Sequence, residues 1–138
     1  MVDQNFQETV KKLFSEKKYD ELIQKVEEYS SIENRHGGLS SVLGVCRMLK
    51  SNYTKDDVVL ALDNFEDAYF KLKDGLGGIE ALGNYIAACI KNCNKFPGII
   101  NYLDKGKLLF DDAKKNFSYN EKLYTSGVDL HKYILDHK

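Results

Sequence analysis

Small and large apolar side chains alternate at helical spacing in two segments of this chain, and no other feature constrains the fold as strongly. Ala61, Phe65 and Ala68 follow one another at intervals of four and three residues, which places them on one face of a helix. Gly44 occupies a similar place in a second apolar stretch, residues 43–49. Because the distance between packed helices depends on the side chains at their contact, small residues allow a close approach. The pattern therefore predicts helices packed tightly side by side.

The apolar period is helical along nearly the whole chain, and the alternation typical of strands is absent. Two pairs of residues fit the capping box that begins a helix: Thr54 with Asp57, and Ser118 with Glu121. The single proline, Pro97, stands where another helix can begin. These signals predict an all-α protein of seven helices.

Glycine-rich segments are expected to separate these helices. Residues 36–38 provide flexible backbone for a change of direction, and Gly75, Gly77 and Gly78 are expected to end the fourth helix. The expected core positions are Phe6, Val10, Leu13, Phe14, Leu22, Ile23, Val26, Tyr29, Leu82, Ile86, Cys89, Ile90, Cys93, Ile99, Ile100, Leu103, Phe110 and Ala113.

The spacing of small positions points to a repeat. Val10 and Gly44 are 34 residues apart, which is the period of the tetratricopeptide repeat, or TPR. Residues 61–68 fit the A-x-x-x-F-x-x-A pattern of the second helix of such a unit, and residues 52–56 are interpreted as an insertion. The third unit has two possible registers. Either residues 82–84 repeat residues 43–45 at a spacing of 39, or Ala87 is its small residue, which we favour.

The sequence thus predicts a TPR-like right-handed array of about three antiparallel helical hairpins in a single domain, residues 1–138. The hairpins are expected at about 4–33, 39–73 and 79–116, and a C-terminal capping helix at about 119–137.

The chain also resembles the divergent TPR regions of bacterial proteins, often marine, that carry glycosyltransferase or sulfotransferase domains elsewhere in the polypeptide. The resemblance covers about residues 39–92 and rests on residues 43–49, 61–71 and 78–82. Residues 94–138 are too short and too helical to hold a transferase domain. The resemblance therefore implies a binding or spacing module rather than chemistry.

Charge and hydropathy narrow the class of protein. The chain has 20 basic and 21 acidic residues and a net charge of −1, so no overall field attracts it to nucleic acid or lipid. No apolar run approaches the roughly 20 residues that span a bilayer, and residues 1–19 are too charged for a signal peptide. We expect a soluble, cytoplasmic protein.

No motif in the sequence organises a catalytic, cofactor or metal site. The histidines His36, His131 and His137 belong to no HExxH motif, and residues 75–78 lack the strand or the Lys-Ser/Thr pair of a nucleotide-binding loop. An odd set of three cysteines predicts buried thiols rather than disulfides. Five acidic residues interleave with apolar residues and predict a solvated helix face rather than a catalytic pair: Asp56, Asp57, Asp63, Glu66 and Asp67. We expect no enzyme, no cofactor and no metal.

The predicted binding site is the surface formed by the first helices of successive hairpins, which in TPR arrays lines a concave groove. This groove would comprise Gln7, Lys11, Ser41, Val45, Met48, Asn84, Tyr85, Ala88 and Lys91. Ser41 and Val45 interrupt the Lys and Asn pattern of a carboxylate clamp, which favours a partly apolar ligand with Lys11 and Lys91 at its edge. The alternative that Val45, Met48 and Tyr85 belong to the core stays open.

The function predicted from these features is a non-catalytic protein–protein interaction module that binds a peptide or helix in the groove. A second hypothesis is the non-catalytic N-terminal portion, or a substrate-holding subunit, of a glycosyltransferase- or sulfotransferase-type enzyme. The lysine pairs 11–12, 17–18 and 114–115 allow a third, nucleic-acid binding, which the nearby acidic residues disfavour.

Overall fold

Every regular element in the described part of the chain is a helix. The computed structural model describes residues 4–31, 34–73, 75–116 and 123. The elements are α1 (Gln4–Ser15), α2 (Tyr19–Tyr29), α3 (Gly37–Leu49), α4 (Lys55–Leu72), α5 (Leu76–Asn92), the 3₁₀-helix η1 (Ile99–Tyr102) and α6 (Leu103–Asn116). The all-α prediction is confirmed for these residues. The predicted capping helix and the Ser118–Glu121 capping box lie outside them, except for Leu123, which is buried.

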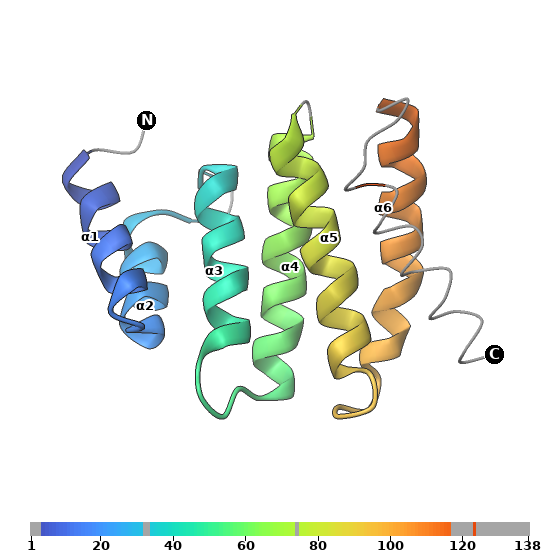
Figure 1. Ribbon diagram of the computed structural model, residues 1–138, viewed down its shortest axis with the longest axis horizontal. Helices are drawn as coiled ribbons and strands as arrows, with labels where there is room; N and C mark the ends of the chain where they lie inside the picture. Colours follow the sequence, from blue (N-terminus) through green and yellow to red (C-terminus); the bar gives the residue numbers. More distant parts are fainter. Residues whose placement is uncertain (1–3, 32–33, 74, 117–122, 124–138) are drawn as a thin grey trace.

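The helices lie in sequence order across the molecule, from α1 at one end to α6 at the other (Figure 1). Each helix packs chiefly against its neighbours in sequence, and the α3–α4 and α4–α5 interfaces are the most extensive. In addition, α3 contacts α5 directly. The middle three helices therefore form the densest part of the fold.

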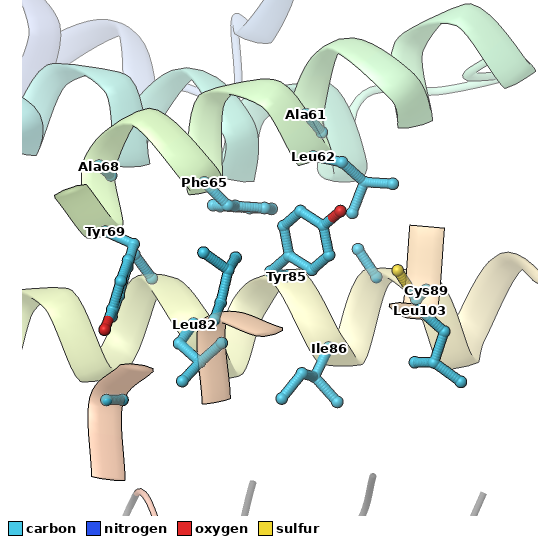
Figure 2. Close-up of a cluster of buried hydrophobic side chains, with 14 of the residues drawn as sticks. Ala61, Leu62, Phe65, Ala68, Tyr69, Leu82, Tyr85, Ile86, Cys89 and Leu103 are labelled. Atoms are coloured by element: carbon cyan, nitrogen blue, oxygen red, sulfur yellow. The ribbon is translucent and has the colours of Figure 1, made fainter. Parts of the chain in front are cut away.

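Two apolar clusters fill the interior. One joins α1, α2 and α3 through Val10, Leu13, Leu22, Ile23, Val26, Leu39, Leu43 and Cys46. The larger one joins α4, α5, η1 and α6, and it includes Val58, Ala61, Leu62, Phe65, Ala68, Tyr69, Ile79, Leu82, Tyr85, Ile86, Cys89, Ile99, Leu103, Leu109 and Ala113 (Figure 2).

The small residues lie where helices approach closely, as their spacing predicts. Ala61 and Ala68 of α4 are completely buried. Gly44 of α3 faces the ring of Phe65, and a Cβ atom at position 44 would lie 2.5 Å from Cε1 of that ring. Since real Cβ atoms do not approach other atoms so closely, the close α3–α4 contact requires glycine here.

The glycines that were expected to break helices mostly lie inside them. The α3 helix begins at Gly37, because the His36 side chain caps it by accepting a hydrogen bond from the amide of Gly38 over 3.0 Å. Gly77 and Gly78 belong to the first turn of α5. A Cβ at position 78 would lie 2.7 Å from the Cα of Lys73, so Gly78 is needed for close packing rather than for flexibility.

The segment after α5 also differs from the prediction. Pro97 lies in a turn and begins no helix. Gly98 follows with φ of 89°, the left-handed conformation that glycine adopts most easily. The chain then forms η1, and α6 begins only at Leu103. Because the chain turns at Pro97 and Gly98, the sixth helix begins later in the sequence than predicted.

Three predicted core residues are exposed rather than buried. Phe14, Tyr29 and Ile100 keep 39%, 41% and 40% of their surface accessible. Tyr29 stacks on Phe6 with ring centroids 3.8 Å apart, which covers one face of the ring. Phe14 and Tyr29 belong to α1 and α2 at the N-terminal end of the described helices, where α3 is the next helix to pack against them.

The acidic residues of α4 do not form one solvated face. Asp56 and Asp63 are exposed, but Asp57 is only 7% exposed. Asp67 is half-buried, accepts a hydrogen bond from the fully buried Ser40 hydroxyl, and pairs with Lys71 over 3.0 Å. The prediction of a solvated series is wrong at Asp57 and Asp67, because both carboxylates find polar partners inside the helix contacts.

Asp57 is the centre of a polar network between α2, α3 and α4. The Thr54–Asp57 capping box is present, as predicted. The capping box uses the Oδ2 atom of Asp57. Its Oδ1 atom lies 3.2 Å from the Lys50 ammonium and 4.0 Å from the guanidinium of buried Arg47. Arg47 also pairs with Glu27 over 3.3 Å. These contacts compensate the charges that the helix packing buries.

Candidate functional site

A groove lies between α3 and α5, and α4 contributes its floor through Phe65. It has a volume of about 190 Å³, and its described lining consists of Val45, Met48 and Leu49 from α3, Phe65 from α4, and Asn84, Ala87, Ala88 and Lys91 from α5. Most of these residues are apolar. The groove therefore presents a hydrophobic surface with few polar groups.

Helical spacing explains why these residues meet. Residues 45, 48 and 49 are separated by three and one positions, and residues 84, 87, 88 and 91 by three, one and three. Such spacings place side chains on one face of a helix. Phe65 reaches the groove from below because Gly44 leaves space for its ring.

The side chain of Met48 contacts the buried Asn92 of α5. The buried amide of Asn92 lies 3.8 Å from the Met48 sulfur and donates a hydrogen bond to the carbonyl of Ala88 over 2.9 Å. The Tyr53 hydroxyl donates to the Asn92 oxygen over 2.7 Å. These contacts fix one wall of the groove at the side where α3 meets α5.

The groove brings together five of the nine predicted binding residues: Val45, Met48, Asn84, Ala88 and Lys91. Gln7 and Lys11 are exposed on α1, and Ser41 is half-buried on α3. None of these three belongs to the described lining.

Tyr85 was expected in the groove, but its side chain belongs to the core. It is 1% exposed, and its hydroxyl donates a hydrogen bond to the carbonyl of Tyr102 over 3.2 Å. Burial, followed by the nearby Cys89 and Glu66, raises the pKa of Tyr85 far above its ordinary value. The prediction is wrong because both α4 and the η1–α6 segment pack against α5, so a position beside the main apolar stripe is also covered. Figure 2 shows Tyr85 in the layer between α4 and α5.

Three lining residues are absent from the predicted site. Phe65 was expected only at a helix contact, although its ring is both buried and part of the groove floor. Ala87 was expected at a close helix contact, but it is exposed and lines the groove. Leu49 is 49% exposed at the end of α3, and its spacing of four residues from Val45 was the signal available in the sequence.

A second hollow lies beside Leu49 and has a different character. It has a volume of about 400 Å³ and is lined by Lys17, Tyr19, Asp20, Leu49 and Ser51. The Asp20 carboxylate lies 3.2 Å from the Lys50 ammonium. Because charges of both signs line or adjoin this hollow, it selects no ionic ligand, and the apolar groove is the stronger candidate.

The thiols differ in accessibility, and this gives a prediction. Cys46 and Cys89 are buried, and burial raises their pKa to about 11 and about 12. Cys93 is half-buried. Since the thiolate is the reactive form, we expect Cys93 to react first with Ellman's reagent near pH 8, and the other two only after unfolding. Cys93→Ser should abolish the fast phase and Cys89→Ser should preserve it; more than one fast thiol would contradict the packing.

Comparison of the chain with protein-family models, with curated proteins and with solved structures finds no match. Within residues 4–31, 34–73 and 75–116, no helix combines the length and the apolar character needed to cross a membrane.

Proposed function

We propose that this protein is a non-catalytic interaction module, built as a TPR-like right-handed array, which binds a segment of a partner protein between α3 and α5. The observation that carries the proposal is the apolar groove, in which five of the predicted binding residues gather. The direct α3–α5 contact supports the array, because these are the first helices of the second and third predicted hairpins. The buried thiols of Cys46 and Cys89 suit a reducing, cytoplasmic location.

The size of the groove suits one large apolar side chain. An apolar cavity of about 150 Å³ accommodates benzene, and the groove measures about 190 Å³. A leucine, methionine or phenylalanine side chain would fill it. Removing apolar surface from water contributes about 25 cal/mol per Å², so this single anchor would supply much of the binding free energy.

The charge at the rim suits an acidic partner. Lys91 is exposed and carries the only formal charge in the described lining. Within the described residues, no acidic side chain forms an ion pair with it. A carboxylate of the ligand would therefore meet a cation that is not already neutralised by a neighbour.

Substitutions in the groove should weaken binding without unfolding the protein. A random peptide library displayed on phage is selected against the wild type, and enriched peptides are measured by fluorescence anisotropy. Ala87→Arg should raise the dissociation constant at least about tenfold, because the new side chain occupies the groove. Position 87 is exposed, so the melting temperature should change little.

Lys107→Glu on α6 is the matched control for Lys91→Glu. Both lysines are exposed on helices, but only Lys91 lines the groove. The Lys91 variant should bind the enriched peptides more weakly, and the Lys107 variant should bind them as the wild type does. Enriched peptides that bind Ala87→Arg as tightly as the wild type would place the binding surface elsewhere.

A further inference from the structure

We infer that the segment bound in the groove is an amphipathic helix whose large apolar anchor lies about one turn from a carboxylate that pairs with Lys91. This inference rests on the proposed function and names the chemistry of its partner. It is supported by the apolar lining, the burial of the Phe65 ring and the position of Lys91.

The lining of the groove favours a ligand whose backbone is helical. An extended segment carries unpaired N–H and C=O groups, and burying them without partners costs free energy. Only Asn84 and Lys91 of the described lining have polar side-chain groups. The α3 and α5 walls are themselves helices, whose interior backbone groups already bond within the helix. A helical ligand satisfies its own backbone and needs only side-chain contacts.

The anchor of the ligand meets an apolar floor. Phe65 is the most buried residue of the described lining, at 2% exposed, and Met48 packs against the same larger core cluster that contains Phe65. Methionine adapts its shape to a neighbouring apolar group and makes favourable contacts with aromatic rings. The floor therefore suits a branched or aromatic side chain inserted from the side of a helix.

The position of Lys91 determines where the ligand carries its carboxylate. Asn84 and Lys91 are seven residues apart on α5, which corresponds to about 10 Å along the helix. The groove is therefore about two turns long. A ligand helix lying along it places side chains three or four residues apart on the same face. An anchor at the centre thus reaches Met48 and Phe65 while an acidic residue one turn away reaches Lys91.

Two synthetic peptide pools test the inference. Both contain peptides of about 16 residues, a length at which an isolated helix begins to be populated. One pool has an alanine-rich helical host, and the other has proline at every third position, which enforces an extended conformation. Each pool is randomised among Leu, Phe, Ser, Glu, Gln and Lys at the positions of one face. Immobilised wild-type protein and the Ala87→Arg variant capture them in parallel, and mass spectrometry identifies the bound peptides.

The helical pool should yield the peptides that the wild type retains and Ala87→Arg does not, with Leu or Phe three or four residues from Glu. Lys91→Glu should weaken the binding of these peptides about tenfold, and replacing the Glu of the peptide by Lys should restore binding to that variant. Groove-dependent capture from the proline pool alone would overturn the helical ligand and leave the proposed function standing. Helical peptides that show no preference for Glu over Gln would overturn the pairing with Lys91. Capture from neither pool, or capture unaffected by Ala87→Arg, would overturn both the inference and the proposed function.

Discussion

Gly44→Ala should lower the free energy of unfolding by about 1 to 3 kcal/mol, as overpacking in a core does. A Cβ at this position would lie 2.5, 2.7 and 2.8 Å from three carbon atoms of the Phe65 ring. The ring is 2% exposed, so it cannot move away into solvent without leaving the core. The groove that the ring lines offers neighbouring space. Urea denaturation measures the loss, and peptide binding should weaken as the ring moves into the groove.

Gly106→Ala is the matched control, because it adds the same methyl group inside another helix. A Cβ there would lie 3.6 Å from the nearest atom of Tyr85, an ordinary contact distance. Since glycine in a helix interior costs about 0.5 to 1 kcal/mol relative to alanine, this variant should be as stable as the wild type or more so. Equal losses in the two variants would show that position 44 is not specially crowded.

A double-mutant cycle identifies the crowded partner. Gly44→Ala should cost less in a Phe65→Leu background than in the wild type, because the smaller side chain leaves room for the added methyl group. The interaction energy between the two positions should then be about 0.5 to 3 kcal/mol. Additive effects would show that the methyl group added at position 44 collides with some other group.

The small residues and the groove were predictable because their signals are local. The spacing of Ala61, Phe65 and Ala68 requires only a helix and a neighbour, and the structure has both. The same is true of Val45 and Met48, which share a face of α3. Periodicity identifies which residues share a face of a helix, and that information was sufficient for these five positions.

Tyr85 was not predictable in the same way. Periodicity does not report how many helices cover a given helix, and α5 is covered by α4 on one side and by η1 and α6 on another. A tyrosine beside the apolar stripe of an exposed helix would face solvent. On this helix it is buried, and its hydroxyl is satisfied by Tyr102.

The burial of Asp57 was not predictable either. The capping box of Asp57 with Thr54 was visible in the sequence. The burial of the Asp57 carboxylate was not visible, because it depends on Arg47 of α3 and on Lys50, which follows α3. Charges are normally assigned to the surface. A buried carboxylate becomes predictable only when its partners are known to meet it in space.

Asp57→Ala is therefore expected to be strongly destabilising, by about 2 to 4 kcal/mol near pH 7. It removes the acceptor of the Thr54 amide, which lies 2.8 Å from the carboxylate, and the 3.2 Å contact with Lys50. It also removes one of the two acidic partners of buried Arg47. Asp56→Ala is the matched control, since Asp56 adjoins it in the same first turn but is exposed. Its effect should be within about 0.5 kcal/mol.

The cost of Asp57→Ala should shrink as the pH falls. Burial by itself raises the pKa of Asp57, but the hydrogen bond from the Thr54 amide and the contact with Lys50 outweigh it, so the pKa lies below its ordinary value. A carboxyl group with a lowered pKa stabilises the fold fully above its unfolded pKa of about 4, and this contribution is lost as the pH falls through the folded value. Urea denaturation of the wild type and Asp57→Ala between about pH 7 and pH 3 should therefore give converging free energies of unfolding. Parallel curves would mean that the charge of Asp57 contributes nothing, and that the effect of the substitution comes from capping geometry and packing alone.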